Sequence, residues 1–288
     1  WAIATIKTSN PLSIKTDSLK LIDHKIQKQY PENSFMADPF IVENDEEYFI
    51  FYEYFPAQIN STWGDIAVLK SIDLINWDFL GVVLDETFHL SYPNVFKWKN
   101  NWYMIPETGG ANDLRIYTTL NFPYNWEYCT TLIPNVKLAD PTLIIKDSLL
   151  YLFTQDKNEQ MRLYYSCDLF SGWKEHPMSP IRSNDSRHGG RPVVLNNKIN
   201  YFIQDHTHGY GTGLIAYEID SISPTSFSDH KIDTVLWRFG NDWATDGMHH
   251  LSCVMLPDST YFCVVDGTQL HEKQVGWDWR KCPKFRFK

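Results

Sequence analysis

The sequence has 288 residues, of which 43% are hydrophobic and 15% aromatic, and its formal net charge is −9. This length suffices for one large all-β domain or two average domains, and the apolar share excludes a disordered chain. The acidic charge argues against nucleic acid or an anionic membrane surface as the main partner. No apolar run reaches 18 residues, so the sequence predicts no membrane span.

Along the chain, one phrase recurs in which a short apolar strand follows a proline. It reads DPFIV at Pro39, YPNVF at Pro93, DPTLI at Pro141 and RPVVL at Pro192, at intervals of 54, 48 and 51 residues. A fifth copy, HHLSCV from His249, keeps the pattern without the proline. Each copy continues with a turn rich in Asn, Asp and Ser and then an aromatic-rich second strand, which is typical of a β-hairpin.

Repeats of about fifty residues, each a meander of short strands, predict an all-β fold, a five-bladed β-propeller in one domain. The predicted blades cover residues 35–86, 90–134, 138–181, 188–233 and 247–270. The fifth blade lacks outer strands, so we expect the N-terminal stretch WAIATIK to complete it. A β-sandwich with coincidental spacing is the alternative. The chain begins with Trp rather than Met, which fits a module of a longer protein.

The first strand of each propeller blade lines the central channel, so the residues before the prolines are expected at one mouth of that channel. These residues are Asp38, Tyr92, Asp140, Arg191 and His249. Hairpin pairing predicts a second ring beside them, on the second strands. The expected pairs are Asp38 with Glu53, Tyr92 with Glu107, Asp140 with Gln155, Arg191 with Gln204 and Asp205, and His249 with Asp266.

This mixture of side chains suggests a site for carbohydrate chemistry. Two carboxyl groups across a gap are the apparatus of glycoside hydrolysis, and Asp38, Asp140 and Glu107 are the catalytic candidates. Arg191 with His249 and His250 would instead hold a phosphate. The substrate-binding candidates are Glu53, Tyr92, Arg191, Asp205, His249, His250 and Asp266. The alternative is a structural ion-pair network without ligand.

No cofactor is predicted. Adjacent histidines in a strand point to opposite faces, so His249 and His250 are not expected to ligate one metal ion, and only a single central cation held by one His stays open. The five cysteines show no CxxC pairing and are expected to be reduced thiols. This, with the absence of a signal peptide, favours a cytoplasmic location and otherwise leaves the location unknown.

The Asp-Pro openings of the first and third repeats resemble the family 43 glycoside hydrolases and related five-bladed propellers. The resemblance implies that Asp38 is the general base and that Asp140 tunes the acid and orients substrate. That family has its catalytic Glu at the opening of the fourth blade, where this sequence has Arg191 in HGGRPV. Glu107 is then the best candidate acid, with Glu53 as the alternative.

A closer resemblance covers roughly residues 35–268. The motifs ADPF, SYPNVF with WYMIPE, ADPTL with LYLF, GGRPV with QD and YG, and HHLS with DG occur in the order seen in the N-terminal domain of plant glucosamine inositolphosphorylceramide transferase and its bacterial relatives. The resemblance implies that sugar transfer belongs to a separate domain, fused or partnering, and places this chain in polysaccharide biosynthesis.

Three functions therefore stay open. The first is a domain associated with a glycosyltransferase that binds or processes a sugar, with a phosphorylated, nucleotide-linked or lipid-linked sugar among the candidates. The second is an enzyme of the glycoside hydrolase type with Asp38 as base. The third is a scaffold without catalysis. The partners expected are a saccharide or sugar-phosphate ligand and no nucleic acid.

Overall fold

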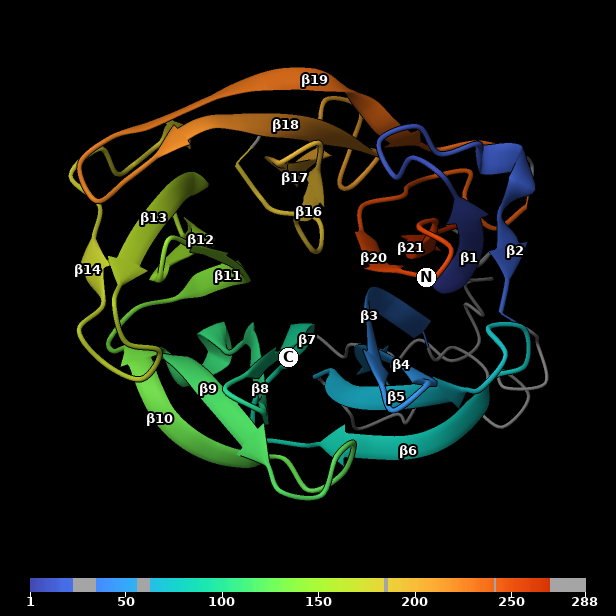
Figure 1. Ribbon diagram of the computed structural model, residues 1–288, viewed down its shortest axis with the longest axis horizontal. Helices are drawn as coiled ribbons and strands as arrows, with labels where there is room; N and C mark the ends of the chain where they lie inside the picture. Colours follow the sequence, from blue (N-terminus) through green and yellow to red (C-terminus); the bar gives the residue numbers. More distant parts are fainter. Residues whose placement is uncertain (23–34, 56–62, 184–185, 241, 270–288) are drawn as a thin grey trace, which may run out of the picture.

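The computed structural model describes residues 1–22, 35–55, 63–183, 186–240 and 242–269, and these form a five-bladed β-propeller. Five sheets are arranged in a ring around one axis, as the view down that axis shows (Figure 1). The prediction of a five-bladed propeller is confirmed. Among the described residues, no helix is long and apolar enough to cross a bilayer.

Each of the first three sheets is a meander of consecutive strands. The first sheet contains β3 (Phe35–Asn44), β4 (Glu47–Phe55), β5 (Asp65–Ser71) and β6 (Asp78–Leu84). The second contains β7 (Ser91–Trp98), β8 (Asn101–Glu107), β9 (Leu114–Thr119) and β10 (Glu127–Ile133). The third contains β11 (Leu138–Lys146), β12 (Leu149–Asp156) and β13 (Gln160–Ser166), with the two-residue strands β14 (Lys174–Glu175) and β15 (Arg182–Ser183) both pairing with β13.

The last two sheets close the ring. The fourth contains β16 (Val193–Leu195), β17 (Lys198–Asp205), β18 (Gly213–Ile222) and β19 (Phe227–Trp237). In the fifth, β20 (Leu251–Met255) and β21 (Tyr261–Gly267) are joined by β1 (Ala2–Thr8) and β2 (Lys20–Leu21) from the start of the chain. Because β1 pairs along its whole length with β21, the first and last parts of the described chain share one sheet.

Five hydrophobic clusters hold the ring together, one at each boundary between neighbouring blades. Phe51 of blade one and Trp102 of blade two, for example, belong to the same cluster. The remaining boundaries are filled in the same way. Burial of apolar side chains between blades therefore fixes the circular order of the sheets.

Two features differ from the sequence prediction. Cys253 and Cys263 lie directly opposite each other on β20 and β21 and form a disulfide, so the expectation of reduced thiols is wrong for this pair. Cys129 and Cys167 are free and exposed. The disulfide removes one of the two reasons for favouring a cytoplasmic location.

The hairpin register also differs, and by the same amount in three blades. Ala37, not Asp38, pairs with Glu53, Ser91 pairs with Glu107, and Ala139 pairs with Gln155. The next two residues of each first strand, including the proline, bulge opposite a single residue of the second strand. The residue before each proline adopts a left-handed backbone, with φ of 51° at Asp38, 48° at Tyr92 and 50° at Asp140.

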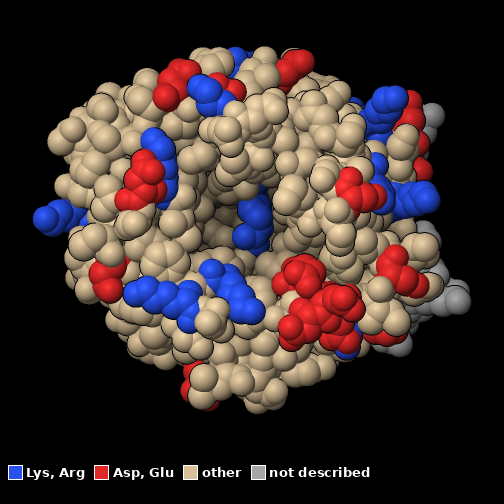
Figure 2. Space-filling view, in the orientation of Figure 1, with Lys and Arg blue, Asp and Glu red and all other residues tan. Residues whose placement is uncertain are grey.

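One end of the channel is visible in the space-filling view (Figure 2), where the centre is hollow and acidic and basic side chains gather on different sides of the opening. The bulged prolines lie at the starts of the first strands, at the other end of each hairpin from its turn. We call the end that carries the bulges the mouth.

Candidate functional site

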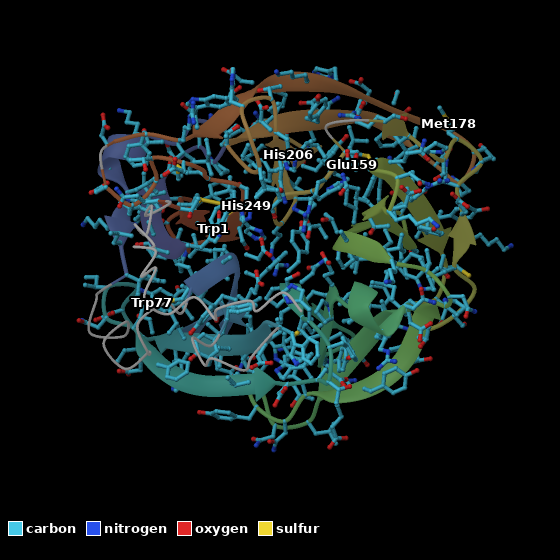
Figure 3. All side chains as sticks on the ribbon, turned by 180° about the vertical axis from the view of Figure 1, so that it is seen from behind. Trp1, Trp77, Glu159, Met178, His206 and His249 are labelled. Carbon is cyan, nitrogen blue, oxygen red and sulfur yellow. A yellow bond between two sulfur atoms is a disulfide. The ribbon has the colours of Figure 1, made fainter. Side chains whose placement is uncertain are left out.

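The mouth collects side chains from all five blades. Figure 3, which looks at the molecule from behind, shows Trp1, His206, His249 and Glu159 near the channel. The acidic residues here come from the bulges at the starts of the first strands and from the ends of the second strands. Their closeness follows from the fold, because the strands that carry them surround one axis.

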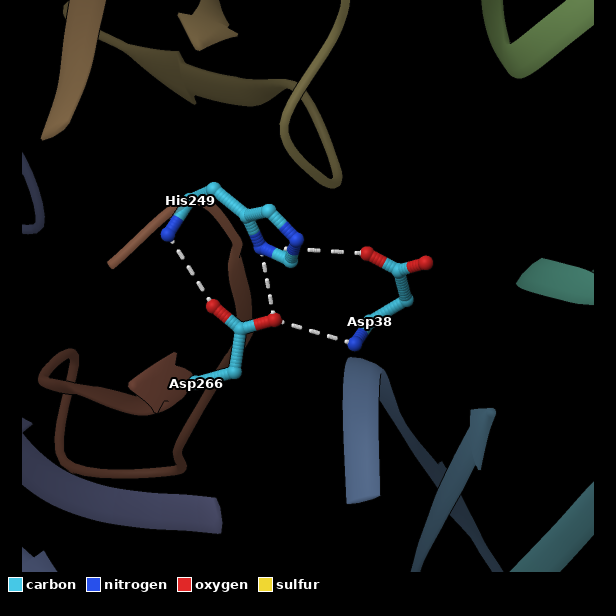
Figure 4. A group of neighbouring side chains, drawn as sticks. All are labelled: Asp38, His249 and Asp266. Carbon is cyan, nitrogen blue, oxygen red and sulfur yellow. Dashed lines mark hydrogen bonds and ion pairs between the residues drawn. The ribbon is translucent and has the colours of Figure 1, made fainter. Parts of the chain in front are cut away.

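Asp38, His249 and Asp266 form a buried cluster where blade five meets blade one (Figure 4). Nδ1 of His249 lies 2.8 Å from Oδ2 of Asp266 and 4.0 Å from Oδ1 of Asp38. The Asp38 backbone N–H donates to Oδ2 of Asp266 at 3.1 Å, and the His249 N–H donates to Oδ1 at 3.1 Å. One carboxylate therefore ties the first strands of two neighbouring blades.

Asp38 repeats this arrangement toward the next blade. Its Oδ2 accepts the backbone N–H of Tyr92 at 3.3 Å, and its Oδ1 lies 3.4 Å from Nδ1 of His250. Burial opposes ionisation of Asp38, but the contact with His250 and the charges of His249 and Arg187 outweigh it and lower its pKa to about 2. Burial lowers the pKa of His249, yet the Asp266 carboxylate outweighs this and raises it overall.

Arg187 is the central cation of the mouth. It lies in the connection between blades three and four, and its Nε donates to Oδ2 of Asp140 at 2.5 Å. Its Nη2 lies 3.5 Å from Oε2 of Glu107. Gln204 completes the set by donating from Nε2 to Asp140 at 2.9 Å. The carboxyl group of Asp140 is thus bound by Arg187 and Gln204, and its side chain is only 1% exposed. The side chains of Glu107 and Arg187 are 19% and 23% exposed to solvent.

At the mouth, the environments of Glu107 and Glu53 favour the neutral form of these carboxyl groups. Burial raises the pKa of Glu107 to about 8. The charge of Arg187 lowers this pKa, but the negative charge of Asp140 acts against Arg187 and raises it. Burial also raises the pKa of Glu53 well above its ordinary value, with the charges of Asp38 and Glu107 adding to it. Nε2 of His89 lies 3.4 Å from Oε1 of Glu53, while Nδ1 of His89 accepts the Gly64 N–H at 2.9 Å.

Aromatic rings border the same opening. The Trp1 ring stacks on His249 with centroids 3.9 Å apart, and Tyr210 meets His249 edge-on at 5.5 Å. The guanidinium of Arg187 lies 5.5 Å from the centre of the Tyr210 ring. Tyr210 is 52% exposed, so one part of its ring is open to a ligand.

A cavity of about 280 Å³ opens beside Arg187 and Tyr210. Its lining is mostly polar and comes from the end of blade three and the loop after β17: Gln155, Glu159, Ser186, Gln204, His206 and Thr207. A small polar hollow beside an exposed aromatic ring suits a ligand with many hydroxyl groups.

Three predicted site residues lie elsewhere. Arg191 does not join the acids, because its Nη2 donates to the carbonyl of Val95 and its guanidinium lies over the Phe40 ring at 5.5 Å. The Tyr92 hydroxyl is buried and bonds to Thr142 and to the backbone of Gly190. Asp205 accepts from the backbone and hydroxyl of Thr207 and shapes the turn after β17.

Glycines explain the position of Arg191. The segment before Pro192 bridges to blade five, where the Leu251 N–H donates to Gly189 O and the Arg191 N–H donates to Leu251 O. A Cβ on Gly190 would lie 1.9 Å from that Leu251 oxygen, and Gly190 has a φ of 117°. In this blade the left-handed residue is therefore Gly190 instead of the residue before the proline, and Arg187, which the repeat alignment missed, reaches the mouth.

At the mouth, one group of side chains could hold a cation. Ligand atoms of Asp38, His249 and Asp266 all lie within 4.8 Å of one another. However, Nδ1 of His249 is at hydrogen-bond distance from Asp266, whose Oδ2 also accepts the Asp38 N–H. The raised pKa of His249 favours an imidazolium here, which balances the acids as a cation would. A central cation would compete with the proton on His249 for the same two carboxylates.

Comparisons with known proteins agree with the fold. The structure is similar to an α-L-arabinofuranosidase from Clostridium thermocellum, with a TM-score of 0.59 and 15% identity over 83% of this chain and 84% of that one. It is also similar to a β-1,2-mannobiose phosphorylase from Listeria innocua, with a TM-score of 0.61 and 13% identity over 92% of this chain and 96% of that one. At these identities the likeness concerns the fold alone.

Sequence comparison identifies the family. The chain is 32% identical over 256 residues to glucosamine inositolphosphorylceramide transferase 1 of Oryza sativa subsp. japonica and 30% identical over 254 residues to that of Arabidopsis thaliana. These matches cover 84% and 83% of this chain but only 34% and 33% of the relatives, so the chain spans about a third of their length. Residues 19–268 match the model of the N-terminal domain of this transferase. The chain belongs to the family of glucosamine inositolphosphorylceramide transferase 1 N-terminal domains.

Proposed function

We propose that this propeller binds a saccharide at its mouth as a glycosyltransferase-associated domain. The observation that carries the proposal is the polar cavity beside Tyr210 and Arg187. Sugars combine apolar ring faces with hydroxyl groups, and the cavity offers one exposed ring with amide, hydroxyl and charged groups around it. The relatives are named as transferases of a sugar, which supports the same class of ligand.

The ligand at the mouth itself is an uncharged sugar unit rather than a sugar phosphate. Arg187 already faces the carboxyl groups of Asp140 and Glu107. The cations expected to hold a phosphate are engaged elsewhere: Arg191 at the Val95 carbonyl, His249 with Asp266 and His250 with Asp38. A phosphate here would also meet the acids of the mouth, which repel an anion.

Saccharide titration of Tyr210 variants tests this function. We expect Tyr210→Ala to weaken binding measured by calorimetry about tenfold, because stacking on an aromatic ring is lost. Tyr210→Phe keeps the ring and should bind like wild type. Tyr124→Ala, which removes an exposed tyrosine between β9 and β10, is the matched control. Binding that is insensitive to Tyr210→Ala, or no saccharide binding by wild type, would contradict the proposal.

A second candidate is glycosidic bond chemistry at the same place. It is favoured by the separation of two pKa values, with Asp38 lowered to about 2 and Glu107 raised to about 8. Such a pair provides an ionised base and a protonated acid at neutral pH. Asp38 would act as base, Glu107 as acid, and Asp140 would orient Arg187 beside Glu107.

Turnover distinguishes catalysis from binding. Wild type, Glu107→Gln and Asp38→Asn would be incubated with oligosaccharides and nucleotide sugars, and products measured by mass spectrometry. Product formed by wild type and lost in both variants is the result expected of an enzyme. Binding without product in wild type would remove the catalytic candidate and leave the binding domain.

A further inference from the structure

A groove leads from the mouth toward the rim between blades two and three. Its inner part is a cavity of about 370 Å³ that begins at Glu107 and Gln155, and its outer part is a cavity of about 500 Å³ that ends near Asn135 and Arg162. Both parts are lined by Lys137, Asp156 and Lys157, so they adjoin. The groove meets the mouth where Glu107 lies 3.5 Å from Arg187.

The walls of the groove are held in place before any ligand binds. On one side, Oδ1 of Asp156 accepts the N–H groups of Asn158 and Gln160, and its Oδ2 accepts from Arg162 at 2.7 Å. On the other side, Asp113 accepts the Asn135 N–H at 3.0 Å. A preformed groove does not have to be ordered at the expense of binding energy.

Gly109 keeps the inner part open. A Cβ at this position would be 3.7 Å from the Leu138 carbonyl and 3.9 Å from Oε1 of Glu107, which is ordinary contact distance. A large side chain at Gly109 would therefore enter the groove rather than clash with the backbone. A substitution at this position would block the groove without replacing any of its charged residues.

Charge is distributed unevenly along the groove. Lys137 and Lys157 are exposed, and neither has an acidic partner within ion-pair distance in the described part of the chain. The third cation, Arg162, is neutralised by Asp156 and by Glu175 at 3.0 Å. Glu107 and Glu159 face the inner part, which borders the mouth, and Glu159 does not line the outer part. Two unpaired positive charges thus mark the stretch where the inner and outer parts meet.

We propose that this groove binds a linear glycan that extends outward from the sugar at the mouth and carries an anionic group, a carboxylate or a phosphate, between Lys137 and Lys157. The inference rests on the proposed function, because it adds further units to the sugar bound there. The groove continues past the space of the mouth cavity, so the ligand has more than one sugar unit. The anionic group lies away from the acids of the mouth, so these acids do not repel it as they would repel an anion bound at the mouth itself.

An array of oligosaccharides with two to five units, each in neutral, carboxylate-bearing and phosphate-bearing form, tests the proposal. We expect the anionic forms to bind more tightly than neutral forms of equal length and to lose the advantage at high salt. Comparison of the carboxylate and phosphate forms identifies the anion.

Three variants assign the binding to the groove. Lys137→Ala with Lys157→Ala should weaken binding of the anionic form about tenfold, as two exposed ion pairs are lost. Gly109→Phe should weaken binding of longer chains and leave single sugars unaffected. Lys174→Ala with Lys231→Ala removes the same charge from the outer strands β14 and β19 and should change nothing. Thermal unfolding checks that every variant is folded.

The outcomes separate the groove from the mouth. Saccharides that bind without preference for charge, and equally well in the groove variants, would overturn the groove while leaving the mouth as the binding site. If the wild-type protein binds no saccharide of any length, both the groove and the mouth are refuted as saccharide sites. The groove is supported if the double lysine variant binds anionic glycans more weakly and Gly109→Phe binds long glycans more weakly than wild type.

Discussion

Arg187 and Asp140 join blade four to blade three through a hydrogen bond of 2.5 Å between Nε and Oδ2. Asp140 lies in the bulge of β11, and Arg187 lies in the connection that follows blade three. The same guanidinium reaches Glu107 of blade two. One cation therefore contacts carboxyl groups of two blades, which makes it both a structural element of the ring and the charged centre of the mouth.

Removal of Arg187 should destabilise the propeller. Arg187→Ala leaves the carboxylate of Asp140 buried without its partner, and we expect the free energy of unfolding to fall by about 3 kcal/mol. Urea denaturation measures this change. Lys198→Ala, which breaks an exposed ion pair with Glu218, should cost less than about 1 kcal/mol. Equal effects of the two substitutions would mean that the Arg187 pair carries no special stability.

Stability should depend on pH through Glu107. Its pKa is about 8 in the folded protein and near 4.5 when unfolded, so between these values the folded state binds more protons than the unfolded state. The free energy of unfolding should therefore fall as pH rises from about 5 to 8. Glu107→Gln removes this contribution and should flatten the profile in urea titrations at several pH values. Parallel profiles for wild type and Glu107→Gln would contradict the raised pKa.

Asp38 should be replaceable by Asn but not by Ala. Its φ of 51° is left-handed, a conformation that Asn tolerates and Ala adopts at a cost of about 1 kcal/mol. Asp38→Ala also removes the acceptor for the Tyr92 N–H and the partner of His250. Thermal unfolding should rank wild type above Asp38→Asn and Asp38→Ala last. Asp45→Ala, at an exposed turn residue with φ of 54°, measures the backbone cost together with the loss of one exposed hydrogen bond from Asn44. If it matches Asp38→Ala, the contacts between blades contribute nothing.

The disulfide should be visible by alkylation. Under denaturing conditions without reductant, Cys129 and Cys167 should react while Cys253 and Cys263 stay protected, and mass spectrometry of peptides identifies each. Reduction should lower the free energy of unfolding by about 3 kcal/mol, because the bond closes a short loop in the unfolded chain. Labelling of Cys253 and Cys263 before reduction would show that the pair is not bonded.

The sequence by itself determined the number of blades. Strand and turn signals recur with each repeat, and one hairpin per copy on a circular ring is the arrangement that buries the apolar faces between neighbouring blades. The same repeats located Asp38, Asp140 and Asp266 near one axis. They also indicated the family, because its motifs occur in order along the chain.

Only the tertiary structure decided how these residues are used. An ideal hairpin places Asp38 opposite Glu53, but the left-handed bulge shifts the pairing by one residue, to Ala37. The Asp38 backbone N–H donates instead to the Asp266 carboxylate of another blade. Arg191 has the same place in the repeat as Asp38, yet Gly190 lets its backbone pair with Leu251 and turns the side chain away. Arg187 shows no repeat signal. Its partners lie 47 and 80 residues away in the chain, and contacts over that distance exist only once blades two and three have packed against each other and against the connection to blade four.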